Sequence, residues 1–232
     1  MITRTTLPEP SVVAGMIDHS LLRPELTSDD VRAGCALAAA RATASVCVRP
    51  SDVRLAAAAL AGTPVLVGTV VGFPHGSTTT AAKVAETRES VTDGAAEIDV
   101  VLHIGRLLEG DAAYVRDDIA AVVAAAEGRT VKVILENALL DADAKVLGCR
   151  LAEAAGAHYV KTSTGFAHGG ATADDIALMR RTVSPHVGVK AAGGVRSLDR
   201  LLELAALGAT RFGATATAAI LDDLAARRTA AG

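Results

Sequence analysis

Two lysines end short apolar segments of this chain, and their side chains could carry amine chemistry. Lys161 ends the segment Ala-His-Tyr-Val-Lys, and Lys190 ends Val-Gly-Val-Lys. Burial and a neighbouring cation both disfavour the ammonium form of a lysine, so two such amines in one partly dry pocket lower at least one pKa. A neutral lysine near pH 7 can attack a carbonyl carbon and form an imine. The alternative is that both lysines bind phosphate or extend outward to solvent.

The use of lysine elsewhere in the chain bears on this hypothesis. Only five of the 23 basic residues are lysine, and three of them, Lys132, Lys161 and Lys190, lie in apolar, strand-like segments. Arginine cannot replace lysine where a neutral, nucleophilic nitrogen is required. Mutational drift toward arginine is an equally simple explanation of the composition, so this observation alone leaves both open.

One carboxylate lies in a similar setting. In the segment Glu-Ile-Asp-Val-Val-Leu (97–102), alternation places Glu97, Asp99 and Val101 on one face of a strand. A carboxylate in an apolar strand needs a cationic partner or a catalytic task. The lysines could supply the partner, and proton transfer could be the task. A purely structural ion pair is the alternative.

Glycine-rich turns suggest an anion site. Backbone N–H groups in such turns, together with a helix N-terminus, can hold a phosphate where glycine allows close approach. Glycines are also common turn formers, so the pattern alone indicates no more than a phosphorylated ligand. The residues concerned are Gly165, Gly193, Gly194, Arg196, Gly213 and Thr215.

Composition argues against several other classes of protein. The net charge of −3 has both signs scattered along the chain, which disfavours nucleic acid and anionic membranes as partners. We find neither a signal peptide nor an apolar run of membrane-spanning length, so we expect a cytoplasmic protein. The three cysteines lack CxxC spacing, and the histidines lack HxH or HExxH spacing. We therefore expect no disulfide framework and no metal site.

The elements that must position these residues alternate regularly along the chain. Strand-like segments are expected at residues 15–17, 44–48, 65–71, 97–102, 131–135, 158–161, 187–190 and 211–213. Helical segments are expected at 29–41, 52–60, 79–93, 112–126, 141–155, 172–181, 198–207 and 218–227. Helices between strands imply parallel strands, and their apolar runs imply burial on both faces. A doubly wound open sheet is the competing architecture, but the chain has no GxGxxG turn after its first strand. The pattern predicts an α/β fold, a (β/α)8 TIM barrel, as a single domain over residues 1–232.

Taken together, these segments resemble the deoxyribose-phosphate aldolase family over nearly the whole chain. Lys161 begins KTSTGF and Lys190 begins KAAGGVR, and this pair of motifs in this order is specific to the family. The other matching segments are IDHSLL (17–22), VCVRPSDV (46–53), VVGFPHG (70–76), EIDVVLHIG (97–105), KVILENALL (132–140) and RFGAT (211–215).

The resemblance implies a class I (Schiff-base) aldolase that reversibly cleaves 2-deoxy-D-ribose 5-phosphate to D-glyceraldehyde 3-phosphate and acetaldehyde. It implies that Lys161 forms the imine, that Lys190 tunes its pKa, and that Asp99 acts as general acid and base through a water. No cofactor is implied, because the imine performs the task that a metal performs in class II aldolases.

The resemblance also implies the substrate contacts. Ser20, Cys47 and Thr162 would line the sugar end of the pocket, with Lys132 beside the charged cluster. The phosphate would rest on the glycine turns named above. Relatives form homo-oligomers, so a dimer or tetramer is implied. Ala216 replaces a serine that often offers a hydroxyl to the phosphate, and His103 and Asn137 also depart from the family pattern.

Two alternatives remain at this point. Another imine-forming barrel aldolase, such as a transaldolase, would need room and hydroxyl partners for a ketose donor. A non-catalytic sugar-phosphate sensor would keep the phosphate site but would not need Lys161, Lys190 and Asp99 together.

Overall fold

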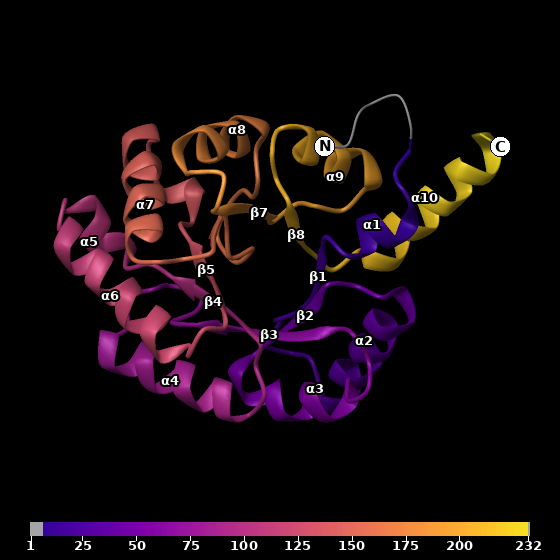
Figure 1. The fold of residues 1–232 in the computed structure, drawn as a ribbon, viewed down its shortest axis with the longest axis horizontal. Coiled ribbons are helices and arrows are strands. Elements are labelled where there is room, and N and C mark those ends of the chain that lie inside the picture. The colour runs from indigo at the N-terminus through magenta and orange to yellow at the C-terminus, as the bar shows by residue number, and fades with distance from the viewer. Residues whose placement is uncertain (1–6, 232) are drawn as a thin grey trace.

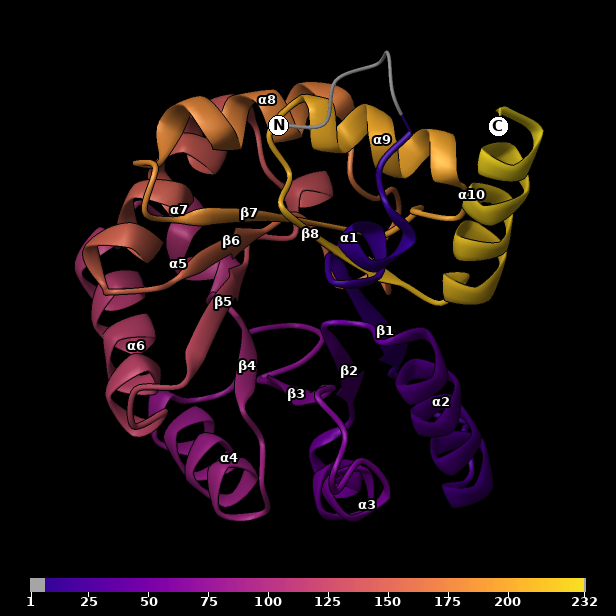
Figure 2. The ribbon, with the colours of Figure 1, turned by 45° about the vertical axis from the view of Figure 1, so that its right-hand side comes forward.

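In the part of the chain that the structure describes, eight parallel strands close into a barrel in sequence order, and the last strand pairs with the first. The computed structural model describes residues 7–231. Figure 2 shows the strands as an inner ring with the helices outside it. The strands are β1 (Ile17–Leu21), β2 (Ser45–Val48), β3 (Leu66–Val71), β4 (Glu97–Val101), β5 (Thr130–Ile134), β6 (Tyr159–Lys161), β7 (Gly188–Ala192) and β8 (Arg211–Ala214). The predicted (β/α)8 barrel is confirmed.

The helices surround this ring (Figure 1), and several begin at a capping side chain. Thr27, Thr79, Asp141, Thr172 and Ser197 each accept a hydrogen bond from the backbone N–H three residues further on. The helices are α1 (Pro10–Ala14), α2 (Ser28–Arg41), α3 (Val53–Ala59), α4 (Thr80–Thr92), α5 (Ile104–Leu108), α6 (Ala112–Ala125), α7 (Ala142–Ala154), α8 (Ala173–Thr182), α9 (Leu198–Ala206) and α10 (Thr217–Ala231), with short 3-10 turns η1 (Pro50–Asp52) and η2 (Asn137–Leu139).

The two faces of each strand have different chemistry. In β4, Ile98 and Val100 are fully buried in the apolar layer between the sheet and the helices. Glu97 and Asp99 alternate with them and point into the barrel, where they meet side chains from other strands. The apolar layer therefore holds the barrel together from outside, which leaves its interior free for polar groups.

A separate buried ion pair lies outside the barrel, between α4 and α6. Lys83 Nζ lies 2.6 Å from Asp118 Oδ2 and donates to the Val101 carbonyl at 3.0 Å. The Thr80 hydroxyl donates to the other Asp118 oxygen at 2.7 Å. This pair ties the two helices to the end of β4.

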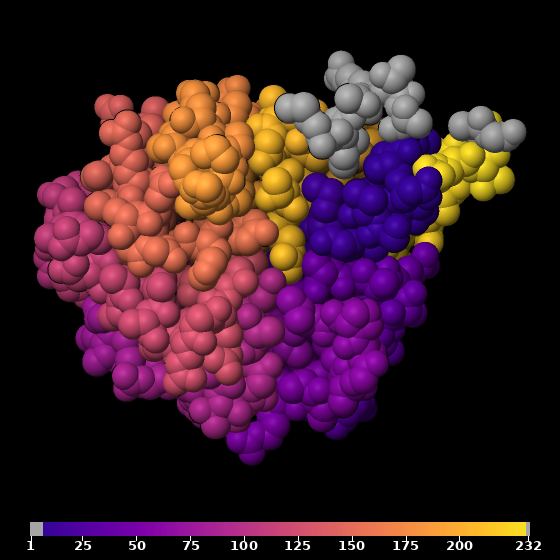
Figure 3. Space-filling model, viewed as in Figure 1, coloured from indigo at the N-terminus to yellow at the C-terminus, as the bar shows by residue number. Residues whose placement is uncertain are grey.

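The two ends of the described chain lie side by side. Figure 3 shows the indigo segment of α1 beside the yellow α10. Arg228 of α10 donates to the carbonyls of Leu7 and Pro8, at 3.0 and 3.1 Å. These contacts hold the segment before α1 against the last turn of α10.

The predicted boundaries agree with the structure except at the first strand and the last helix. Strands two to eight agree within two residues, and the first seven predicted helices within one. The first strand was predicted at 15–17, which is wrong, because β1 covers Ile17–Leu21 and Gly15 caps α1. Asp18 and Ser20 belong to the strand because they alternate on its inner face, where the barrel interior is polar. The last helix, predicted at 218–227, runs from Thr217 to Ala231, and α1, α5 and both 3-10 turns were not predicted.

No helix within residues 7–231 combines the length and apolar character that crossing a membrane requires.

Candidate active site

Lys161 and Lys190 lie on neighbouring strands at the same height. Their Cα atoms are register partners between β6 and β7, so both side chains enter the barrel. Each Nζ lies 2.7 Å from the same oxygen, Oδ2 of Asp99, which reaches across from β4. The two amines that the sequence singled out therefore share one carboxylate.

A second carboxylate holds Lys190. Asp18 of β1 places Oδ2 at 2.5 Å from Lys190 Nζ. Its other oxygen accepts from Arg211 Nε at 2.6 Å and from the Ser45 hydroxyl at 2.7 Å. Lys190 thus has two carboxylate partners, whereas Lys161 has one, which it shares.

Lys132 of β5 is fully enclosed in the same cluster. Its Nζ lies 2.8 Å from Glu97 Oε2, 2.9 Å from Asp99 Oδ1 and 3.7 Å from Asp18 Oδ2. Only 1% of its side chain is exposed. Lys132 therefore supports the carboxylates from behind and does not face the open space above them.

The charges in this cluster do not balance. Four cations (Lys132, Lys161, Lys190 and Arg211) face three carboxylates (Asp18, Glu97 and Asp99). One positive charge is in excess if every group is ionised. The cluster therefore favours the loss of one proton, and the amine with the fewest carboxylate partners is the one expected to lose it.

The pKa directions agree with this count. Burial lowers the pKa of Lys161. The Asp99 carboxylate acts in the other direction but does not offset burial, because the nearby positive charge of Lys190 also lowers the pKa of Lys161. Burial also acts on Lys190, but the carboxylates of Asp18 and Asp99 outweigh it and raise its pKa. Burial of Lys132 is likewise outweighed by its carboxylate partners, which raise its pKa far above the ordinary lysine value. Lys161 is the one lysine of the three whose pKa is lowered.

The two aspartates stay ionised. Burial would raise the pKa of Asp99, but Lys132, Lys161 and Lys190 hold it well below its ordinary value. For Asp18, burial acts in the same direction and is outweighed by Lys190 and Lys132. Both carboxylates therefore act first as acceptors that orient the amines.

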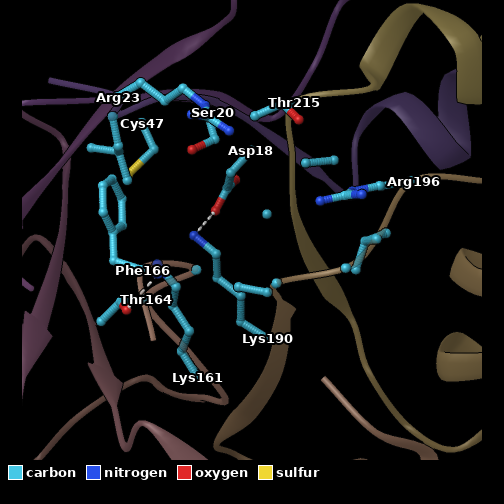
Figure 4. Close-up of a pocket in the computed structure, with 18 residues that line it drawn as sticks. Asp18, Ser20, Arg23, Cys47, Lys161, Thr164, Phe166, Lys190, Arg196 and Thr215 are labelled. Atoms are coloured by element: carbon cyan, nitrogen blue, oxygen red, sulfur yellow. Dashed lines mark hydrogen bonds and ion pairs between the residues drawn. The ribbon is translucent and has the colours of Figure 1, made fainter. Parts of the chain in front are cut away.

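A cavity of about 350 Å³ opens above the lysines. In Figure 4, Lys190 and Asp18 point toward each other in its middle, with Phe166 and Cys47 to one side and Arg196 to the other. Its lining comes from the ends of five strands and the loops after them: Asp18, Ser20, Leu22, Arg23, Cys47, Lys161, Thr164, Gly165, Phe166, Lys190, Ala192, Gly193, Gly194, Val195, Arg196, Gly213, Ala214 and Thr215.

The side of the cavity near Arg196 is formed by glycine turns. Gly193 and Gly194 both have positive φ, at 81° and 79°, a conformation that favours glycine. A Cβ on Gly193 would lie 2.9 Å from the Gly170 backbone, whereas one on Gly194 would meet nothing within 4 Å. The turn is thus tightly packed behind and open toward the cavity, with the exposed Arg196 and Thr215 at its rim.

The opposite side is more apolar. Leu22, Cys47 and Val70 form a small buried cluster against which Phe73 packs. Phe73 meets the ring of Phe166 edge-on at 5.2 Å between centroids, which joins the loops after β3 and β6. Burial raises the pKa of the Cys47 thiol to about 11, so Cys47 lines the cavity as a neutral group.

Most predicted site residues line this cavity, but three lie behind its wall. Asp99 and Lys132 belong to the charged cluster beneath it. The Thr162 hydroxyl donates to the Ala192 carbonyl at 2.9 Å and accepts from the Ala192 N–H at 3.0 Å. It joins the ends of β6 and β7, and its contact with a sugar stays a prediction.

Three residues of the cluster, Asp18, Glu97 and Arg211, were not predicted as site residues from the sequence. Asp18 alternates with Ser20 on β1, and Glu97 shares a face with Asp99, so a signal for both was present in the pattern. Arg211 begins β8 and donates to both carboxylates. Its partners are more than a hundred residues away in the chain, and no local pattern indicates them.

Comparison with known proteins gives a consistent assignment. The model of the DeoC/LacD family of aldolases matches residues 12–222. The chain is 51% identical over 212 residues to a deoxyribose-phosphate aldolase of Lysinibacillus sphaericus, covering 91% of this chain and 95% of the relative. It is 50% identical over 211 residues to the Staphylococcus epidermidis enzyme of that name, covering 91% and 96%.

A solved structure shares the fold. The deoxyribose phosphate aldolase of Aeropyrum pernix, described as having a unique tetrameric structure, superposes with a TM-score of 0.88 at 29% identity. The match covers 94% of this chain and 93% of the Aeropyrum chain. The family model and the two curated relatives settle the assignment, and the chain belongs to the DeoC/LacD family of aldolases.

Proposed function

We propose that the chain is a class I aldolase that reversibly cleaves 2-deoxy-D-ribose 5-phosphate to D-glyceraldehyde 3-phosphate and acetaldehyde. The observation that carries the mechanism is the position of Lys161. Its amine faces the cavity, its pKa is lowered, and it shares the Asp99 carboxylate with Lys190. The names of the relatives support the substrate.

The first step joins Lys161 to the open-chain sugar. The lone pair of the neutral Nζ attacks the C1 aldehyde and forms a carbinolamine. Loss of the hydroxyl as water, with one proton taken up, gives the protonated imine. Lys190 keeps its proton more strongly than Lys161 does, so it is placed to donate in this step, with Asp99 holding both nitrogens.

The second step breaks the C2–C3 bond. A base removes the proton of the C3 hydroxyl, and C3 becomes the aldehyde of glyceraldehyde 3-phosphate. The C2–C3 electron pair forms a C1=C2 bond, and the imine electrons move onto nitrogen to give an enamine. Protonation of C2 and addition of water then release acetaldehyde and Lys161. We assign the proton transfers to Asp99 acting through a water.

The phosphate binds away from the reacting bonds. Its proposed cradle consists of Gly165, Gly193, Gly194 and Gly213 with Arg196 and Thr215 at the rim. Backbone N–H groups hold a phosphate without a change in protonation, so the cradle orients the sugar for attack by Lys161. Ser20 and Cys47 line the same cavity and would contact the sugar chain.

We further propose that the chain works as one cytoplasmic domain and as a homo-oligomer, a dimer or a tetramer. The tetramer described for the Aeropyrum relative supports self-association. Light scattering of the purified protein over a range of concentrations tests this part separately from the chemistry.

The mechanism is tested by trapping the imine. The protein is incubated with acetaldehyde, reduced with borohydride, digested and analysed by peptide mass spectrometry. We expect an ethyl group on Lys161 and none in the Lys161→Ala variant. An ethyl group on Lys190 alone would exchange the roles of the two lysines. Absence of any adduct, with deoxyribose 5-phosphate still bound, would support a sensor instead.

A further inference from the structure

A partly buried arginine, Arg211, lies beneath the reactive lysines and does not line the cavity. Arg211 Nε donates to Asp18 Oδ1 at 2.6 Å, and its NH2 donates to both oxygens of Glu97 at 2.9 and 2.8 Å. The guanidinium therefore bridges β1 and β4 across the barrel from β8. Its side chain is 11% exposed, and neither carboxylate is more than 3% exposed.

These contacts use the carboxylates that could otherwise neutralise the lysines. Asp18 has one oxygen on Arg211 and the other near Lys190. Glu97 is divided between Arg211 and Lys132. Both carboxylates are thus already neutralised by groups other than Lys161, which leaves it only the Asp99 oxygen that Lys190 also uses.

The proton behaviour of arginine distinguishes it from the other three cations. A guanidinium stays protonated in proteins, whereas a lysine ammonium can lose its proton. The excess positive charge of the cluster must therefore be relieved on a lysine. Lys132 and Lys190 each have at least two carboxylate partners, so the loss falls on Lys161.

Within residues 7–231, the other side chains that the strands direct into this interior add no further charge to balance the cluster. The register places Ser45 and Cys47 of β2, Gly68 and Val70 of β3, and Tyr159 of β6 around the same interior. The ring of Tyr159 fills the space that a side chain at Gly188 would occupy. Arg211 is accordingly the group that turns a balanced set of three lysines and three carboxylates into one with an excess cation.

We propose that Arg211 is a positioning residue that keeps the Lys161 amine neutral, by supplying a fixed positive charge and by occupying Asp18 and Glu97. The proposal rests on the proposed imine chemistry of Lys161. Arg211 would thus influence the nucleophile Lys161 through its charge, without contacting the substrate.

The test measures the rate of imine trapping with acetaldehyde and borohydride as a function of pH. This rate rises with pH as Lys161 loses its proton. In Arg211→Met the pH at which the trapping rate increases should be higher by about one unit, because one cation has been removed from a buried cluster. In Glu97→Gln it should move down, because one anion has been removed. The double variant should return close to the unaltered protein.

Opposite shifts that cancel are not expected from structural damage, which lowers the rate at all pH values alike. Arg211→Lys keeps a cation at this position. Its pH dependence should therefore lie close to that of the unaltered protein and should show little of the shift expected for Arg211→Met. Lys83→Met, which removes a buried cation outside the barrel, should leave the position of the rise unchanged. Thermal unfolding identifies variants that do not fold. If Arg211→Met does not fold, the direction of the shift in Glu97→Gln still tests whether the charge of the cluster controls Lys161.

Two results would overturn the inference. One is a pH dependence of the trapping rate that stays the same in folded Arg211→Met or Glu97→Gln, while the unaltered protein forms its adduct normally. The other is a shift of both single variants in the same direction. Absence of an adduct in the unaltered protein at every pH would instead refute the imine chemistry itself, so the two failures are distinguishable.

Discussion

Lys83 and Lys161 are both buried lysines with a carboxylate at 2.6–2.7 Å, yet their surroundings differ in a decisive way. Burial lowers the pKa of both, and the partner carboxylate only partly offsets it. Asp118 serves Lys83 alone among the lysines, and a backbone carbonyl completes the site. Asp99 is shared by three lysines, and Lys161 borders a cavity. Burial alone thus does not make a nucleophile, which also needs access and an incompletely neutralised charge.

The largest expected effect follows from replacing Lys161, which is proposed to form the imine, whereas Lys83 is not. Lys161→Met should lower kcat/KM for deoxyribose 5-phosphate cleavage by at least roughly 10⁴-fold, because Lys190, the other lysine that lines the cavity, has a raised pKa and keeps its proton. Coupled detection of glyceraldehyde 3-phosphate measures the rate. A loss below tenfold would place the nucleophile elsewhere.

The second effect concerns the shared carboxylate. Lys190→Met should lower kcat/KM at pH 7 by roughly 10²- to 10³-fold, because a proton donor is lost. Loss of this cation also raises the pKa of Lys161, so less of it is neutral at a given pH. The rise of kcat/KM with pH should therefore move to higher pH. A pH profile that keeps its position would show that Lys190 does not act on Lys161 through charge.

A third, smaller effect is expected at the phosphate cradle. Arg196→Ala should raise KM for deoxyribose 5-phosphate about tenfold and leave kcat nearly unchanged, because the lost contact is uniform in ground and transition states. Unphosphorylated deoxyribose supplies the control, since its kcat/KM should not change. An equal loss for both sugars would remove Arg196 from the phosphate site.

The smallest effect on activity is expected at Lys83. Lys83→Met should leave kcat/KM within about two-fold, but it should lower the free energy of unfolding by about 3 kcal/mol because Asp118 keeps a buried charge without its partner. Urea unfolding monitored by circular dichroism measures the second quantity. A large loss of activity in a folded Lys83→Met variant would show that the Lys83–Asp118 pair outside the barrel also affects the chemistry at Lys161.

Much of the fold could be predicted because its signals are local. Apolar strands that alternate with capped helices, at a spacing that fits parallel pairing, predict a barrel without any long-range information. The error at residues 15–17 has the same origin. Apolar composition was taken as the mark of a strand, but Asp18 and Ser20 of β1 face an interior that the sequence does not display.

The candidate site was predicted in part. Lys161, Lys190 and Asp99 were identified by residue type, strand position and family motifs, and the structure brings them together. Arg211 and the pairing of Asp18 with Lys190 were missed, because these contacts join β8 and β7 to β1 and β4 only when the barrel closes.

The sequence by itself determined which residues share a face of each strand, since side-chain alternation follows directly from the strand period. It also determined that two amines would lie on neighbouring strands. Only the tertiary structure decided which of the two amines has the lowered pKa. That depends on how three carboxylates are divided among four cations across the closed barrel, and the energy of each pair changes steeply with distance and burial.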